Sequence, residues 1–353
     1  MAREIAEQPA AISRTLDALR PLRGEITALA AGRRNVLFVA RGSSDNAAIY
    51  GRYLIEVHAR RPAGLAAPSV ATHYGATLDL SDALVVCVSQ SGETQEIVDT
   101  LEWARRCGAR TVAVTNGGAS ALAMAADIAL ITQAGPEHAV PATKSYTTQL
   151  AAMAVLASAL AEDQAALDPD LDRVSREVER LVHARAGVDD AVDRLAESIE
   201  TLVSGRGIVF GTALETALKL EETCLRPVRG LSYADLRHGP IAVVDADHAA
   251  VLVSAADGPI VEGMTDLAQD LRARGVAATI GIGGDAPFAA ACDIAVAGPD
   301  LPELVAPLAL IVPAQLVVEG LARRLGLDPD APRGLSKITQ TDPSTQTDSE
   351  ETD

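Results

Sequence analysis

Aromatic residues, lysine and basic charge are all scarce in this sequence. Aromatic residues make up 3% of the 353 residues, and 30 basic residues stand against 48 acidic ones, for a formal net charge of −18. A surface that binds nucleic acid or an anionic membrane needs a basic patch, so this balance argues against both kinds of partner. Lysine occurs only at Lys144, Lys219 and Lys337. Because arginine supplies nearly all of the positive charge, each lysine is a candidate for a specific role.

Long apolar runs and paired cysteines are also missing. The longest runs, 150–161 and 305–318, fall short of the roughly 18 residues that a membrane span needs, so we expect two buried helices. Residues 1–9 lack the pattern of a signal peptide, and the four cysteines form no Cys-x-x-Cys pair. No His, Cys and carboxylate cluster has metal-ligand spacing, and no Gly-x-Gly-x-x-Gly follows the first predicted strand. We therefore expect a cytoplasmic protein with reduced thiols that needs no metal or redox cofactor.

Hydrophobic residues make up 48% of the chain, which is ample for packed cores, and 353 residues fit two domains of about 150 residues each. Buried strands alternate with helical stretches, which is typical of an α/β fold with a doubly wound, mainly parallel sheet flanked by helices. The strands are expected at 35–40, 83–88, 110–115 and 128–131 in the first half, and at 207–210, 249–254, 278–282 and 294–296 in the second.

The order of these elements indicates a tandem duplication. In each half, a glycine follows the first predicted strand and a serine lies at the end of the second. The two residues are 47 positions apart in the first half (Gly42 to Ser89) and 43 in the second (Gly211 to Ser254). We expect a helical segment at 1–30, two α/β units at 31–161 and 201–327, a helical connector at 162–200, a lysine-bearing tail at 328–340 and a disordered acidic tail at 341–353.

Two loops rich in hydroxyl groups follow predicted strands of the first half. They supply Ser43, Ser44, Ser89, Gln90, Ser91 and Thr94. A helix start favours an anion through its free N–H groups and its dipole, and open α/β sheets bind ligands at the carboxyl ends of their strands. We expect the two loops to hold one phosphate together, the alternative being ordinary helix caps. The second half has Ser-Ala-Ala-Asp-Gly-Pro at 254–259 instead, so only one such site is expected.

A second group of candidates lies in the second half. Glu215, Lys219 and Glu222 are spaced to share one helix face, where a solvated row of ion pairs is the alternative to a catalytic carboxylate. A glutamate in a strand-end crevice can act as a general base. His238 falls in a predicted turn, Arg-His-Gly-Pro, and could serve as a general acid, although a single loop histidine is more often structural. Lys337 could pair with an anion or condense with a carbonyl, the alternative being a surface lysine.

Five motifs, in this order, resemble those of the sugar isomerase (SIS) domain family. They are Ser-Gln-Ser-Gly-Glu-Thr at 89–94, Ala-Thr-Lys-Ser-Tyr-Thr-Thr-Gln-Leu at 142–150, Ala-Leu-Lys-Leu-Glu-Glu at 217–222, Leu-Arg-His-Gly-Pro at 236–240 and Pro-Arg-Gly-Leu-Ser-Lys at 332–337. The resemblance covers residues 1–340 and is to the isomerase half of glucosamine-6-phosphate synthase and its deaminase-type relatives. It implies two tandem SIS units and a homodimer with shared active sites.

The resemblance also implies roles for individual residues. The two hydroxyl loops would hold the phosphate of a hexose or hexosamine 6-phosphate, and the sugar would contact Val140, Pro141, Ala142 and Lys219. Glu222 would move a proton between C1 and C2, His238 from the partner subunit would open the ring, and Lys337 could form a Schiff base with a ketose. Pro141 departs from the alanine typical of the family, which could reshape the sugar contact.

The sequence begins at the helical segment, without the synthase's glutaminase domain, so we expect no built-in source of ammonia. The loops at 41–46 and 139–144 resemble those of stand-alone, catabolic members. The predicted reaction is the deaminating isomerisation of glucosamine 6-phosphate to fructose 6-phosphate and ammonia. The alternatives are a fructosamine-phosphate deglycase, an aminotransferase-like or plain aldose–ketose isomerase, and a non-catalytic phosphosugar sensor. A sensor would lack the proton-transferring residues and would usually carry a DNA-binding helix-turn-helix.

Overall fold

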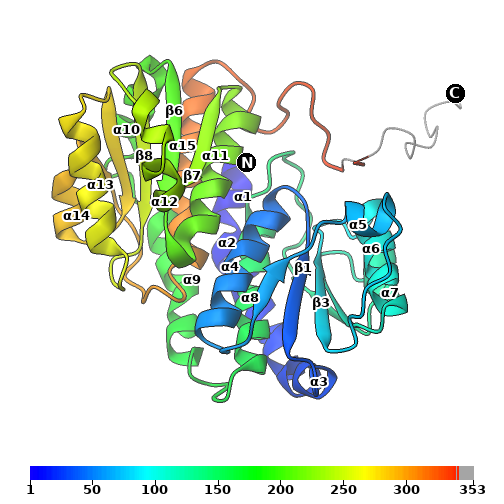
Figure 1. Cartoon of the computed structure of the whole chain (residues 1–353). Helices are drawn as coiled ribbons and strands as arrows, with labels where there is room; N and C mark the ends of the chain where they lie inside the picture. Colours follow the sequence, from blue (N-terminus) through cyan, green and yellow to red (C-terminus); the bar gives the residue numbers. More distant parts are fainter. Residues whose placement is uncertain (339, 342–353) are drawn as a thin grey trace, which may run out of the picture.

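Two parallel five-stranded sheets with the same strand order form the framework of the chain (Figure 1). The computed structural model describes residues 1–338 and 340–341. The first sheet, ordered β2-β1-β3-β4-β5, contains β1 Asn35–Val39, β2 Ala63–Leu65, β3 Ala83–Val88, β4 Arg110–Thr115 and β5 Ile128–Ile131. The second, ordered β7-β6-β8-β9-β10, contains β6 Glu200–Gly205, β7 Val228–Ser232, β8 His248–Ser254, β9 Ala278–Gly283 and β10 Ile294–Val296. The predicted α/β class with parallel sheets is confirmed.

The central strands are apolar runs because helices cover both faces of each sheet. Every residue of β3 and of β9 is buried, which is the pattern expected of a parallel sheet between two helical layers. The helices are α1 Ala2–Ala6, α2 Gln8–Leu19, α3 Arg23–Leu29, α4 Ser43–Val57, α5 Ser69–Thr72, α6 Gln95–Arg106, α7 Ala121–Ala125, α8 Lys144–Leu160, α9 Asp168–Val182, α10 Val188–Glu197, α11 Phe210–Cys224, α12 Tyr233–Arg237, α13 Val261–Ala273, α14 Ala286–Ala291 and α15 Pro307–Arg324.

Helices α4, α8, α11 and α15 form the layer between the two sheets (Figure 1). All residues of α8 are buried, and so are most of α15, which confirms that the two long apolar runs are buried helices. Helices α4 and α11 approach closely at Gly211, where a Cβ atom would lie 2.5 Å from the backbone oxygen of Asn46. The two units are thus packed backbone to backbone at this point.

One predicted strand is wrong. Residues 207–210, expected to be a strand, form a 3₁₀ turn at Gly207–Val209 that leads into α11, and the strand precedes them as β6. The strand ends before Gly207 because this residue has a φ of +66°, a left-handed conformation that cannot continue an extended strand. The prediction failed because β6, which contains the buried Ser204, is more polar in sequence than residues 207–210. Two short strands, β2 and β7, were not predicted.

The two halves share further features besides their strand order. Gly42 and Gly207 are the left-handed glycines that precede the first helix of each unit, and each stands 47 residues before the serine at the end of the third strand. A side-chain contact also recurs: Asp127 accepts hydrogen bonds from the backbone N and hydroxyl of Thr111, and Asp293 does the same for Thr279. The structure is consistent with two SIS-like units.

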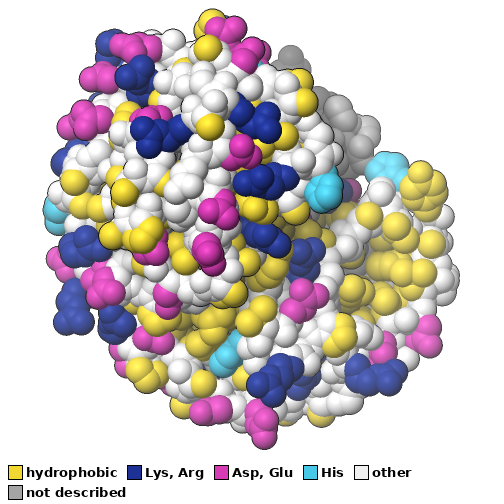
Figure 2. Space-filling view, turned by 60° about the vertical axis from the view of Figure 1, so that its left-hand side comes forward, with side chains coloured by type: hydrophobic (Ala, Val, Ile, Leu, Met, Phe, Trp, Pro, Cys, Tyr) yellow, Lys and Arg dark blue, Asp and Glu magenta, His cyan; other side chains and the backbone are white. Residues whose placement is uncertain are grey.

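The surface carries charge of both signs. On the face shown in Figure 2, Lys and Arg side chains are interspersed with Asp and Glu and do not gather into one basic patch. None of the helices within residues 1–338 and 340–341 is long and apolar enough to cross a membrane. Most of the acidic tail predicted to be disordered, residues 342–353, lies outside the described residues.

Candidate active site

A cavity of about 450 Å³ lies at the carboxyl ends of β1 and β3, where it meets α11 and the tail. Its lining includes nearly all of the predicted site residues, drawn from five separate parts of the sequence. They are Ser43, Ser44, Ser89, Gln90, Ser91, Thr94, Val140, Ala142, Lys219, Glu222 and Lys337. This position agrees with the rule that open parallel sheets bind ligands at the carboxyl ends of their strands.

Local hydrogen bonds hold the hydroxyl loops in shape. Ser89 Oγ accepts a bond from the backbone N of Gly92 at 3.2 Å, and Ser91 Oγ accepts one from Glu93 at 3.2 Å. Gln149 of α8 donates to Ser44 Oγ at 3.0 Å. Because each serine oxygen accepts a bond, its own O–H hydrogen can be donated to an anion in the cavity.

Helix α11 carries a row of charged side chains that leads from the buried Glu215 through Lys219 to Glu222 at the cavity. Lys219 Nζ lies 3.5 Å from Glu215 and 2.5 Å from Glu222 Oε2, and Asn46 of α4 donates to Glu215 at 2.9 Å. The predicted sharing of one helix face is confirmed, but the row is not a solvated one: Glu215 and Lys219 are fully buried and Glu222 lines the cavity.

Burial and the attraction between opposite charges shift the pKa values of Glu215 and Lys219 in opposite directions. Burial raises the pKa of Glu215, and Lys219 together with Asn46 only partly offsets it. Burial alone would lower the pKa of Lys219, but Glu215 and Glu222 outweigh it, and the pKa of the ammonium lies above its usual range. Lys219 is therefore held as a cation against the carboxylate of Glu222.

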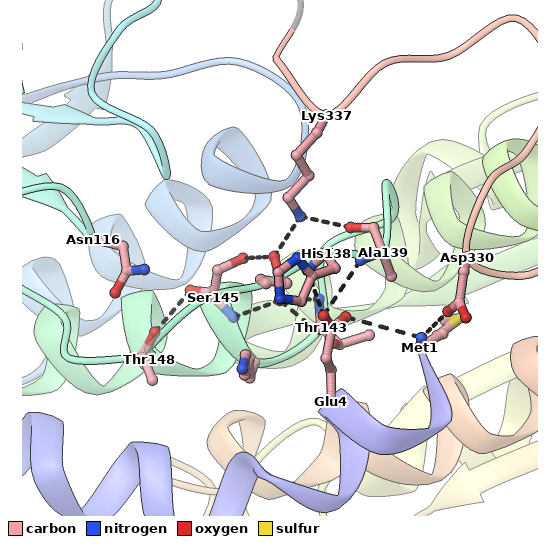
Figure 3. Close-up of polar contacts among 12 residues, drawn as sticks. Met1, Glu4, Asn116, His138, Ala139, Thr143, Ser145, Thr148, Asp330 and Lys337 are labelled. Atoms are coloured by element: carbon pink, nitrogen blue, oxygen red, sulfur yellow. Dashed lines mark hydrogen bonds and ion pairs between the residues drawn. The ribbon is translucent and has the colours of Figure 1, made fainter.

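Lys337 reaches from the tail to the loop that precedes α8 (Figure 3). Its ammonium donates to Glu137 Oε2 at 2.6 Å and to the carbonyl of Ala139 at 2.7 Å. The Glu137 carboxylate is buried and also accepts bonds from the backbone N of Thr143 at 3.0 Å and from the hydroxyl of Ser145 at 2.6 Å. Burial raises the pKa of Glu137, but Lys337 and Ser145 outweigh it, so that its pKa lies below the usual range.

Hydrogen bonds from two further segments, α1 and the tail, also hold the loop between Glu137 and α8. Glu4 of α1 accepts hydrogen bonds from the backbone N–H groups of His138 and Ala139 (Figure 3). The backbone N of Val140 donates to the carbonyl of Asp330 in the tail at 2.9 Å. Figure 1 shows this tail leaving α15 in the second unit and running toward the first. The loop and the tail therefore fix each other beside the cavity.

Two predicted site residues do not line the cavity. His238 lies in the predicted turn, after α12, and its side chain is exposed. Pro141 is buried, although both of its neighbours line the cavity. Within residues 1–338 and 340–341, no three His, Cys, Asp or Glu side chains gather in a way that could hold a metal ion.

Several residues at the cavity were not predicted. Arg41 directly precedes the first hydroxyl loop, and Leu335, Ser336, Ile338 and Thr341 surround the tail lysine. The only sign of these residues in the sequence was that they lie next to predicted site residues. Glu137 was missed altogether, because nothing in the sequence indicates that it would contact a lysine 200 positions away.

Comparisons with known proteins point to one family. Residues 30–159 match the family model described as "SIS domain". Over 345 residues the chain is 34% identical to the glutamine–fructose-6-phosphate aminotransferase (isomerizing) of Thermococcus kodakarensis, covering 96% of this chain and 57% of that protein. The chain thus spans little more than half the length of that relative.

Solved structures agree in fold over nearly the whole chain. The C-terminal domain of glucosamine-fructose-6-phosphate aminotransferase from Francisella tularensis superposes with a TM-score of 0.80 at 26% identity, covering 93% of this chain and 97% of that one. A candidate phosphosugar isomerase from Silicibacter pomeroyi superposes with a TM-score of 0.82 at 31% identity, covering 94% and 99%.

Proposed function

The chain belongs to the sugar isomerase (SIS) domain family, and from that premise we propose that it converts glucosamine 6-phosphate and water to fructose 6-phosphate and ammonia. One observation carries the proposal: a single cavity joins the hydroxyl loops at the sheet edge, the Glu222 carboxylate and the Lys337 ammonium. The reaction requires a site that binds phosphate, a group that accepts a proton and an amine that can contact the sugar's carbonyl group.

The phosphate binds at the two hydroxyl loops in this proposal. The phosphate-binding residues lie at the start of α4 and in the loop that leads into α6, where backbone N–H groups and the helix dipoles favour an anion. They are Ser43, Ser44, Ser89, Gln90, Ser91 and Thr94. The corresponding loop of the second unit carries Asp257, whose carboxylate accepts a bond from the backbone N of Glu303 at 2.7 Å. The phosphate site is thus assigned to the proposed first unit, residues 31–161, and the proton transfer to the second, residues 201–327.

Proton transfer falls to Glu222. Its carboxylate removes the C2 proton of the open-chain amino sugar and returns a proton to C1, so that the aldose amine becomes a ketose imine. Water then adds to C2 of the imine and ammonia leaves, which gives fructose 6-phosphate. Lys219 contacts the Glu222 carboxylate at 2.5 Å and holds it in place, and both residues come from α11, a largely buried helix.

His238 and Lys337 complete the proposed site. His238 is exposed and outside the cavity of its own chain, which fits a role in ring opening in the active site of a second subunit, and we propose a homodimer on this ground. Lys337, held by Glu137 and Ala139, stands where the loop of Val140 and Ala142 meets the cavity, so it can contact the carbonyl end of the sugar.

A substrate panel tests the proposal. Purified protein is incubated separately with glucosamine 6-phosphate, a fructosamine 6-phosphate and fructose 6-phosphate, and ammonia and hexose phosphates are quantified. Equal amounts of ammonia and fructose 6-phosphate from the first substrate are expected. Turnover of fructosamine 6-phosphate alone would indicate a deglycase, and interconversion of fructose 6-phosphate with an aldose alone an isomerase. Binding of phosphosugars without turnover would indicate a sensor.

A further inference from the structure

Three cationic side chains line the cavity, and each contacts a carboxylate. Lys219 is paired with Glu222 on α11, and Lys337 is paired with the buried Glu137 in the loop before α8. Arg41 is the third, and its Nη2 lies 2.9 Å from Glu96 Oε1. Arg41 differs from the two lysines in position, because it directly precedes Gly42 and the hydroxyl loop of β1.

The guanidinium of Arg41 is only partly engaged. Besides Glu96, it donates from Nη1 to the carbonyl of Ala40 at 3.2 Å, and no other acceptor contacts its side chain within residues 1–338 and 340–341. A guanidinium has five N–H donors in a planar fork that matches a phosphate. The side chain is 45% exposed, so it can turn toward a ligand in the cavity without disturbing the core.

We propose that Arg41 is a further ligand of the substrate's phosphate group and that it selects a doubly charged group over a singly charged or neutral one. This inference rests on the proposed function, which puts the phosphate on the hydroxyl loops. Hydroxyl and backbone N–H donors also accommodate neutral oxygens, whereas a guanidinium carries a full positive charge and binds a dianion far better than a neutral group. A chain of net charge −18 repels an anion, so a cation beside the loops is needed to offset that field.

Glu96 is the positioning residue for Arg41. Its side chain is buried, it lies in the first turn of α6, and its second oxygen accepts a bond from the hydroxyl of Thr341 at 2.8 Å. The helix start and the threonine hold the carboxylate in place, and the carboxylate keeps Arg41 beside the cavity. Glu96 also competes with the phosphate for the same guanidinium, so its negative charge limits the affinity.

Titration calorimetry with inorganic phosphate and the full chain tests both roles. Arg41→Gln is expected to weaken phosphate binding at least about tenfold, the loss typical of a charged hydrogen bond, and Arg41→Lys to recover part of that loss. Arg34→Gln is the matched control, because Arg34 is exposed and pairs with Asp82 away from the cavity, and it should bind as the wild type does. Glu96→Gln should bind phosphate more tightly than the wild type, a gain that a merely structural role would not produce.

The double variant Arg41→Gln/Glu96→Gln separates the two residues. If Glu96 acts through Arg41, the gain from Glu96→Gln disappears in the Arg41→Gln background. Wild-type affinity in Arg41→Gln overturns the assignment of Arg41, and a gain that persists in the double variant overturns that of Glu96. Phosphate binding that depends on Arg41, in a protein that turns over no amino sugar, would refute the proposed reaction and leave this inference standing. A wild-type protein that binds no phosphate would refute both.

Discussion

The ammonium of Lys337 lies 2.6 Å from the buried carboxylate of Glu137, although the two residues are 200 positions apart. This pair joins the tail after the last helix to the loop before α8, and the same carboxylate orders that loop through Thr143 and Ser145. Removing Glu137 should therefore disturb the tail and the loop together.

Glu137→Gln should change how stability depends on pH. Burial raises the pKa of Glu137, but Lys337 and Ser145 outweigh it, so its pKa in the folded protein lies below the ordinary value. Its contribution to the free energy of unfolding is complete above the unfolded pKa of about 4.3 and is lost as the pH falls through the lower, folded pKa. Urea unfolding at a series of pH values from neutral to acid should show a steeper loss for the wild type than for the variant.

Glu303→Gln is the matched control for this measurement. Burial and the nearby Asp257 raise the pKa of Glu303, so the ionised group opposes folding and the pH-dependent difference from the wild type should have the opposite sign. Equal slopes for the wild type and Glu137→Gln would contradict the proposed ion pair.

Ser89→Ala should weaken substrate binding while the corresponding change in the second unit does not. Both serines are buried, and Ser89 directly follows β3 while Ser254 is the last residue of β8, but only Ser89 lines the cavity. Loss of one hydrogen bond to a charged phosphate should raise KM for glucosamine 6-phosphate roughly tenfold. Ser254, whose hydroxyl donates to the carbonyl of Ala255 at 3.0 Å, can be changed to alanine with KM unaffected. Equal KM values for both variants would count against the phosphate site.

Gly211→Ala should affect stability and turnover together. The added Cβ would meet the backbone oxygen of Asn46 at 2.5 Å and force α4 and α11 apart, at a cost of about 1–3 kcal/mol in the free energy of unfolding. Because these helices carry Ser43 and Ser44 of the first hydroxyl loop and Glu222, kcat should fall by on the order of tenfold or more.

Gly24→Ala is the control for that change. Gly24 also lies in a helix, has no atom within 4 Å of its added Cβ, and should give a neutral or slightly stabilised protein, by about 0.4–1 kcal/mol. A Gly211→Ala variant as stable and active as Gly24→Ala would contradict the close contact between the two units.

The sequence was sufficient for the fold class because the buried strands are continuous apolar runs. β3 is such a run throughout and β8 over Ala249–Val253, and both lie where the pattern predicts them. β6 was misplaced since its sequence, Glu-Thr-Leu-Val-Ser-Gly, is less apolar than the Gly-Ile-Val-Phe that follows, and only the left-handed Gly207 shows where the strand has ended. β2 has three residues and β7 contains Arg229 and Gly230, so neither carries a strand signal.

The candidate site could be predicted only where its residues belong to local motifs. The hydroxyl loops, the α11 face and the tail lysine were all found in this way, and the structure places them around one cavity. Contacts between distant segments could not be predicted from the sequence. The pairing of Arg41 with Glu96 and that of Lys337 with Glu137 depend on how the loops and the tail pack against each other.

The most direct measurement is the rate of ammonia release from glucosamine 6-phosphate by the wild type, Glu222→Gln and Glu221→Gln. Glu221 is the adjacent carboxylate, is exposed and does not line the cavity, so it controls for the charge of the helix. Loss of the proton acceptor in Glu222→Gln should lower kcat by about 10²–10⁴-fold, whereas Glu221→Gln and the wild type should release ammonia and fructose 6-phosphate in equal amounts at similar rates. Wild-type turnover by Glu222→Gln would contradict the account.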